Sequence, residues 1–202
     1  MVRPMKLFLV GLGTAALVAC SNNPVEPASI FDPPTLRWAS LAKACPADAP
    51  ATSLPADLKA TLPVSTFKSI DDRAAELAKE IPGGWGGYAY IEHDHFNMFL
   101  IDPSQKKAAL SALASRGVPP DDYIEVHQGR WDFAQLYDWY RYLGPRVLPG
   151  IKVSSSDIQE ARNRIEYSVI NEEERAKLEQ ALSDLDIPCW LVAIKIQGYA
   201  TI

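Results

Sequence analysis

The 202-residue sequence predicts an α+β fold of two tandem small modules, each ordered helix, β-hairpin, helix and strand. Segments with apolar residues at helical spacing alternate with short apolar runs that have the two-residue period of strands. The pattern also occurs twice, because residues 97–119 resemble residues 163–188. The asparagines that begin these segments are 66 residues apart and the prolines that end them 69 apart, so we expect three extra residues before the helix of the second copy.

The first 19 residues have the three parts of a secretory signal peptide. Arg3 and Lys6 are followed by an apolar run without charge, residues 7–19, which is too short to span a bilayer stably. Residues 17–20, Leu-Val-Ala-Cys, then resemble the lipobox of bacterial lipoproteins, in which the cysteine is acylated and becomes the first residue of the mature chain. The resemblance implies lipidation of Cys20. The alternative is an ordinary signal peptide that a cysteine follows by chance.

The charge of the mature chain restricts how it reaches a membrane and what it binds. Removing residues 1–19 leaves 18 basic and 25 acidic side chains, a net charge of −7. That balance lacks the basic footprint of a nucleic-acid-binding protein and does not favour anionic lipids, so attachment is expected through the acyl chains of Cys20. Ser21 stands where an aspartate would indicate retention in the inner membrane. The resemblance therefore implies the outer membrane, with the protein facing the periplasm.

Residues 20–64 are expected to be a proline-rich tether. Residues 21–64 contain eight prolines and lack the periodic apolar residues of a core, so we expect an extended spacer with one short helix over residues 36–44. Cys45 in this tether and Cys189 near the end of the chain are the thiols that remain once Cys20 is lipidated. A disulfide between them is the expected pairing in an oxidising compartment, and two buried free thiols are the alternative.

The first module is predicted over residues 65–130. The segment from Ser69 to Glu80 has an acidic first turn and apolar residues at helical spacing, and the Pro-Gly-Gly run at 82–84 ends this helix. Asp102 caps a second helix whose first residue is a proline, and Gly117 ends it. The expected elements are a helix over 69–80, strands over 88–91 and 98–101, a helix from 103 to about 117 and a strand over 123–127.

The connecting helix and the second module are predicted over residues 131–202. Asp132 and Gln135 form a near capping box for the connecting helix, which Gly144 and Pro145 end. Four apolar residues of the last strand alternate onto one face. The expected elements are a helix over 132–143, strands near 151–153 and over 164–170, a helix over 172–186 and a strand over 190–196.

Two segments resemble the pro-regions of bacterial secreted serine proteases of the alpha-lytic and streptogrisin type. They are the motif over 157–165 with the following helix and Ile-Pro ending, and the helix that begins at Trp131. The resemblance covers roughly residues 65–196. In that family two small α+β domains fold the protease and then inhibit it, partly by adding a sheet edge to the enzyme. This sequence contains no protease domain, so the resemblance implies a protein-binding role and carries over no catalytic residue.

The hairpin of the first module carries the strongest metal-binding pattern of the sequence. His93 and His95 lie two residues apart among acidic neighbours, and His127 is expected on a neighbouring strand. Three imidazoles with a carboxylate would suit zinc or copper. The alternative, which we expect, is that these histidines lie in an exposed hairpin turn and bind no metal, and we expect no other cofactor. The sequence has neither a Gly-x-Ser-x-Gly elbow nor a cysteine beside a histidine, either of which would indicate a catalytic nucleophile. No enzymatic activity is therefore expected.

The connecting helix carries more aromatic residues than one buried face can hold. Phe133 and Tyr140 belong to an apolar stripe that we expect in the core, whereas Tyr137, Trp139 and Tyr142 cannot all join it. Aromatic side chains left outside a core are typical interface anchors, so these three are candidate binding residues. Packing between the two modules is the alternative.

These observations favour a membrane-anchored envelope lipoprotein that acts as a protein-binding module. Its expected partner is an extracytoplasmic protease, which it would inhibit or help to fold, or another envelope protein. The alternatives are a structural or assembly lipoprotein of the envelope with no link to a protease, and a metal-binding protein that uses the three histidines.

Overall fold

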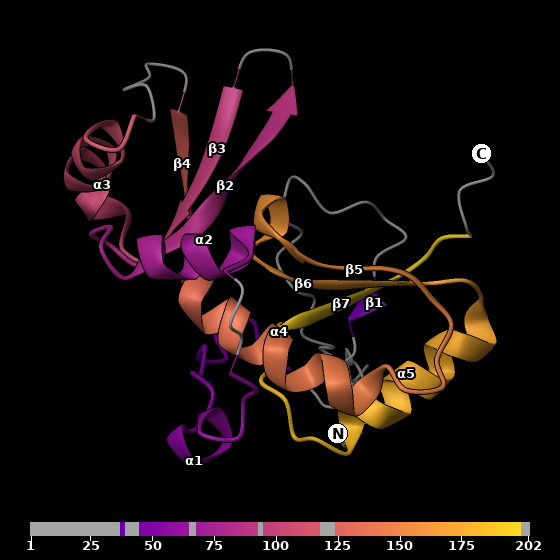
Figure 1. The fold of residues 1–202 in the computed structure, drawn as a ribbon. Coiled ribbons are helices and arrows are strands. Elements are labelled where there is room, and N and C mark those ends of the chain that lie inside the picture. The colour runs from indigo at the N-terminus through magenta and orange to yellow at the C-terminus, as the bar shows by residue number, and fades with distance from the viewer. Residues whose placement is uncertain (1–36, 39–44, 65–67, 93–94, 118–123, 199–202) are drawn as a thin grey trace, which may run out of the picture.

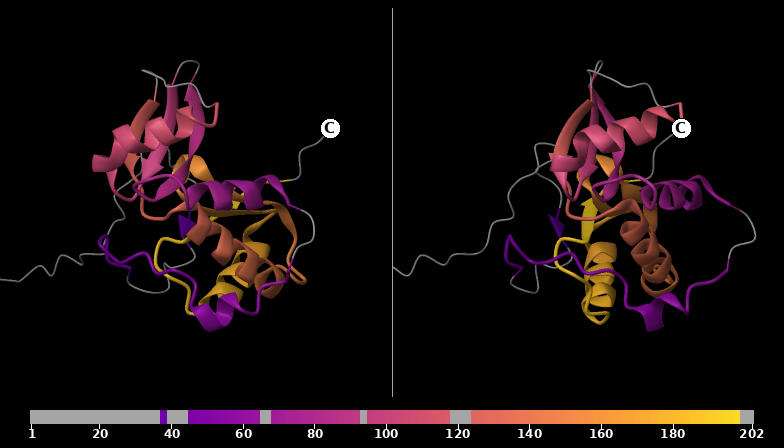
Figure 2. Two further views of the ribbon diagram at one scale, coloured as in Figure 1. Left: turned by 60° about the vertical axis from the view of Figure 1, so that its left-hand side comes forward. Right: turned by 90° about the vertical axis from the view of Figure 1, so that its left-hand side faces the viewer.

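The computed structural model describes residues 37–38, 45–64, 68–92, 95–117 and 124–198 (Figure 1). Within these residues the predicted fold class is confirmed: two α+β modules follow each other, each ordered helix, β-hairpin, helix and strand. In both modules the last strand pairs in parallel with the second strand of the hairpin. Figure 2 shows the first module above the second in both of its views.

The first module has one three-stranded sheet and two longer helices. Its first helix begins with a capping box, in which Ser69 Oγ accepts from the Asp72 N–H and the Asp72 carboxylate accepts from the Ser69 N–H. Asp102 accepts from the Ser104 N–H at the turn into the second helix. The elements are α2 (Ile70–Ala78), β2 (Trp85–Glu92), β3 (His95–Leu100), a 3-10 turn (Pro103–Gln105) that leads into α3 (Lys106–Ala114), and β4 (Ile124–Gln128), in the sheet order β2-β3-β4.

The second module repeats this arrangement after the connecting helix. Asp132 and Gln135 form the predicted capping box. The helix continues through Pro145 to Val147, past its predicted end, because the burial of Val147 stabilises one more turn. The elements are α4 (Phe133–Val147), β5 (Val153–Gln159), a 3-10 turn (Glu160–Arg162), β6 (Arg164–Val169), α5 (Glu172–Ser183) and β7 (Val192–Ile196).

The structure corrects the register of the repeat. Asp102 and Asn171 cap the segments that contain the second helices and are 69 residues apart, and the strands β3 and β6 each end two residues before them. The asparagines that suggested a spacing of 66 are not equivalent, because Asn97 lies inside β3 whereas Asn163 precedes β6. The predicted three extra residues are therefore wrong for this part of the repeat.

One cluster of buried side chains extends through both modules, with α4 at its centre. In Figure 1 α4 lies beneath α2 and in front of the strands of the second sheet. The largest fully buried side chains include Trp131, Phe133, Leu136 and Leu143 from α4 and the residues before it, and Met98, Leu100, Ile165 and Tyr167 from the central strands. The two modules therefore share a core.

Residues 45–64, here called the strap, lie against the fold instead of forming the predicted extended spacer. The strap contains the short helix α1 (Ala56–Lys59). Its backbone carbonyls accept hydrogen bonds from side chains of the modules: Arg130 donates to Ala47 O (2.8 Å) and to Ala49 O (2.7 Å). Prolines do not prevent this docking, because a proline lacks only the N–H and keeps its carbonyl acceptor.

The predicted disulfide between Cys45 and Cys189 is present and joins the start of the strap to the turn before β7. Trp190 Nε1 donates to Pro46 O (2.8 Å) beside it. Arg37–Trp38 forms β1, which pairs antiparallel with β7 and makes the second sheet four-stranded, in the order β1-β7-β6-β5. These two residues therefore do not belong to the helix predicted over 36–44, and the remainder of that range lies outside the described residues.

Candidate functional site

A groove of about 350 Å³, here called the junction groove, opens where the two modules meet. It is the candidate functional site because it leaves large apolar side chains accessible to solvent. Its lining consists of Ile70, Arg73, Ala74 and Leu77 from α2, Trp85 and Tyr88 from β2, Phe133 from α4 and Glu160 from the turn after β5.

One wall of the groove is a single face of α2. Ile70, Ala74 and Leu77 follow the spacing of residues that share a helix face. Ile70 is 84% exposed, although its helical spacing alone predicts burial. The difference arises because this end of the helix face meets the groove, not the core.

Aromatic rings form the floor and the opposite wall. Trp85 and Phe133 are buried and stacked, with ring centroids 6.0 Å apart and planes inclined by 26°. The Tyr88 ring lies 5.8 Å from Trp85 and is 42% exposed, so it forms the outer edge of this wall. Stacked rings hold one another in place, so the floor of the groove is preformed.

Two glycines of β2 allow the modules to approach closely beside the groove. A Cβ atom on Gly86 would lie 2.5 Å from Trp131 O, and one on Gly87, whose φ is +106°, would lie 2.6 Å from Glu160 Cγ. Such distances exclude any larger residue unless the neighbours move. Glu160 therefore lies directly on the backbone of β2, although it belongs to the second module.

Asn163 links the modules beside the groove. Its Oδ1 accepts from the backbone N–H groups of Arg130 (2.7 Å) and Trp131 (2.8 Å), and its Nδ2 donates to Trp131 O (2.8 Å) and Gly86 O (3.4 Å). The residue is buried and has a left-handed backbone (φ 52°), which asparagine tolerates better than most residues. These bonds connect three separate segments and so fix the walls of the groove relative to one another.

Three carboxyl groups gather around the groove: Asp71 beside Ile70, Asp157 on β5 and Glu160 in the lining. Burial, with smaller contributions from the charges of Asp157 and Asp71, raises the pKa of Glu160 to about 7. Burial also raises the pKa of Asp71 and that of Asp157, and a neighbouring carboxylate adds to each increase. The site is therefore apolar within and acidic at its edge.

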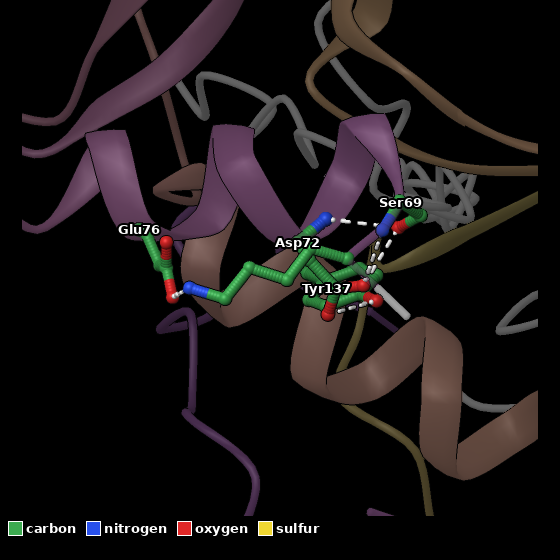
Figure 3. A network of polar contacts seen from close by, with 5 residues as sticks. Ser69, Asp72, Glu76 and Tyr137 are labelled. Atoms are coloured by element: carbon green, nitrogen blue, oxygen red, sulfur yellow. Dashed lines mark hydrogen bonds and ion pairs between the residues drawn. The ribbon is translucent and has the colours of Figure 1, made fainter. Parts of the chain in front are cut away.

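A second contact fixes α2 against α4 and so holds the first wall in place (Figure 3). Tyr137 Oη donates to Asp72 Oδ1 (2.7 Å), while Asp72 Oδ2 accepts from the Ser69 N–H and from Ser69 Oγ. The hydrogen bonds from Tyr137 and Ser69 hold the pKa of Asp72 below its usual value. The candidate binding residue Tyr137 thus joins two helices, and its hydroxyl is engaged within the chain.

The structure places the other two aromatic candidates inside the fold. Trp139 is 4% exposed and Tyr142 7%, with their rings edge to face at 5.9 Å. Trp139 Nε1 donates to Thr52 O of the strap (2.8 Å), and the Arg146 guanidinium lies 3.9 Å from the Tyr142 ring centroid. Neither ring is an exposed anchor, because the strap packs where the sequence predicts only a spacer. Trp139 thus contacts the strap. Neither the predicted interface role nor the alternative of packing between the modules includes this contact.

The histidine pattern is only partly within the described residues. His93 and the side chain of His95 lie outside them. His127 shares a hydrogen bond of 2.5 Å with Asn97 Oδ1, and its ring lies 5.5 Å from that of Phe99. In the described ranges no group of three or more His, Cys, Asp or Glu residues could hold a metal ion.

Cys20 also lies outside the described residues, so its lipidation stays a prediction. Among the helices that the structure describes, none is both long and apolar enough to cross a membrane.

Sequence reasoning missed the junction groove and its acidic edge. Gly86 and Gly87 are the signal that indicates it, because glycine inside a strand indicates close approach of another backbone or side chain. Helical spacing identifies the face that carries Ile70 but not whether another element covers it.

No family model matches this chain, and no curated protein matches its sequence.

Proposed function

We propose that this chain is an envelope lipoprotein that binds another protein through the junction groove, held by the lipid on Cys20 at the periplasmic face of the outer membrane. The exposure of Ile70 and Tyr88 in the lining of one apolar groove is the observation that carries the binding role. Grouped large apolar side chains in a concave surface are typical of interaction sites. The groove is also held open by contacts within the chain, which lowers the entropic cost of binding.

Two features support the location. Residues 17–20 resemble a lipobox, and the Cys45–Cys189 disulfide suits an oxidising compartment outside the cytoplasm. Cys20→Ala should move the protein from the membrane fraction to the soluble fraction or leave it unprocessed. A Cys20→Ala protein that is cleaved and still membrane-bound would contradict the anchor.

Site-specific crosslinking tests the binding role. A photo-reactive p-benzoylphenylalanine at Tyr88 should capture a partner in intact cells, and the same group at Lys107 on the exposed side of α3 should not. Ile70→Ser should lower capture from position 88 at least fivefold while the melting temperature stays the same, because Ile70 is exposed. Equal capture from positions 88 and 107, or none, would contradict binding at the groove and favour a structural role in the envelope.

The resemblance to protease pro-regions supports an extracytoplasmic serine protease as the class of partner. If the crosslinked partner is such an enzyme, added full-length chain in detergent should reduce its cleavage of a peptide substrate. The Ile70→Ser variant should inhibit less at the same concentration. A crosslinked protein of another class would remove the link to proteases and leave the binding role intact.

A further inference from the structure

The edge of the junction groove carries negative charge that the fold leaves uncompensated. Within the described residues, Asp71, Asp157 and Glu160 form no ion pair, whereas the nearby Glu166 accepts a hydrogen bond of 2.6 Å from Arg162. Arg73 is the basic residue in the groove lining, and it forms no ion pair with Glu160. The balance at this edge is therefore three acidic groups to one basic group.

The charged and apolar parts of the groove are immediate neighbours. Asp71 follows the exposed Ile70 on α2, and Glu160 packs on Gly87, the residue before Tyr88. A side chain lying on Ile70 and Tyr88 would therefore place its own neighbours within reach of the carboxylates. Attraction between charges is stronger in such a partly enclosed site than in open water.

We propose that the junction groove binds a partner segment that carries a lysine or arginine directly beside an apolar side chain. The apolar side chain lies on Ile70 and Tyr88, and the cation faces Asp71, Asp157 and Glu160. The cation relieves the repulsion among the three carboxylates, and the apolar group covers surface that the fold leaves in water. This inference rests on the proposed function and names the chemistry of the partner at the same site.

Two labelled peptides that differ in one charge test the inference. They are Gly-Leu-Lys-Leu-Gly and Gly-Leu-Glu-Leu-Gly, each carrying a fluorophore, titrated with the full chain in detergent micelles and followed by fluorescence anisotropy. The lysine peptide should bind at least fivefold more tightly than the glutamate peptide. In the double variant Glu160→Gln with Asp157→Asn, the ratio should fall below twofold.

Two further variants separate charge from apolar contact. Asp184→Asn, which removes an exposed carboxylate at the end of α5, should keep the full preference for lysine. Ile70→Ser should weaken both peptides by the same factor, because it removes apolar contact without changing charge. Circular dichroism of each variant confirms that it is folded.

The outcomes separate this inference from the proposed function. Equal affinity of the wild-type chain for the two peptides overturns the charge preference, as does a preference that survives in the double variant. If the wild-type chain binds both peptides equally and Ile70→Ser weakens that binding, docking in the groove is still supported. Binding of neither peptide overturns the inference, and the crosslinks from position 88 then decide the proposed function by themselves.

Discussion

The two modules share one topology but are closed to different degrees. All six residues of β6 are buried, and β7 beside it is buried from Val192 to Ile194. In the first module, Ile124 is the one buried residue of β4. The second sheet also gains β1 and is linked to the strap by the disulfide, whereas the described residues of the first sheet form three strands. The same unit is thus a closed framework in one copy and leaves accessible surface in the other.

The difference shows that a short segment outside a repeat can determine which surfaces of each copy are covered and which stay exposed. The strap packs on α4, and β1 extends the second sheet, while the equivalent helix of the first module, α2, keeps Ile70 exposed. Substitutions in the strap contacts and in the first module should therefore differ in their cost to stability.

Removing the disulfide should have the largest effect on the closed module. The Cys45–Cys189 link spans 144 residues of sequence, and the chain-entropy model predicts that its loss lowers the free energy of unfolding by about 5 kcal/mol. Urea denaturation of the Cys45→Ala, Cys189→Ala double variant measures the change. A loss below about 1 kcal/mol would show that hydrogen bonds and packing hold the strap without the disulfide.

Paired aromatic truncations should show which module depends on the strap. Trp139→Ala should cost about 4 kcal/mol, because it removes a buried ring and leaves the Thr52 carbonyl without its donor. Tyr88→Ala should cost about 1 kcal/mol or less, because that ring is partly exposed. Thermal and urea unfolding of the two variants compares them directly. Equal costs would contradict the division between the modules.

The two asparagines that suggested the repeat should differ in their effect on stability. Asn163→Ala should lower the free energy of unfolding by about 3 kcal/mol, because it leaves the buried N–H groups of Arg130 and Trp131 without an acceptor. Asn97→Ala loses the hydrogen bond that Asn97 Oδ1 shares with His127 and should cost about 1 kcal/mol. A similar cost for both would mean that Asn163 does not couple the modules.

Glu160→Gln should change how stability depends on pH. The pKa of Glu160 is about 7 in the folded chain and about 4.5 in an unfolded one, so folding binds a proton between these values and stability falls as pH rises through this window. After allowance for partial exposure the fall is on the order of 2 kcal/mol. Unfolding at about pH 5 and pH 8 should show a smaller fall in the glutamine variant. Asp71 and Asp157 contribute with the same sign in both proteins, so the difference reports Glu160 together with its coupling to these two carboxylates.

Local rules predicted the order of the elements well. The cap at Asp132 forms the predicted bonds within three residues, so no distant contact is needed to specify it. The hairpins and the parallel last strands also follow from the two-residue apolar period of the strands and from the lengths of the connections between them. The strand expected near 151–153 overlaps β5 only at Val153, because the three serines that follow lack an apolar alternation and depend on pairing with β6.

The errors at the candidate site have a different physical origin. The strap docks through backbone carbonyls, which every residue carries, so its composition indicates only a spacer. The exposure of Ile70 depends on what covers α2, and the burial of Trp139 depends on the strap, so both require the arrangement of distant segments. Glu160 reaches the groove because Gly87 admits it, which is a contact between modules.

The pairing of β1 with β7 has a consequence for reach if a lipid on Cys20 anchors the protein to a membrane. The linker from Cys20 to Arg37, the first residue that pairs with β7, would span at most about 60 Å when fully extended. A spacer that reached residue 65 would span about 150 Å. Because effective concentration falls as about the −3/2 power of linker length, the shorter linker raises the effective concentration of the groove near the membrane about 4-fold. Partners that are themselves held at that membrane surface gain most from this confinement.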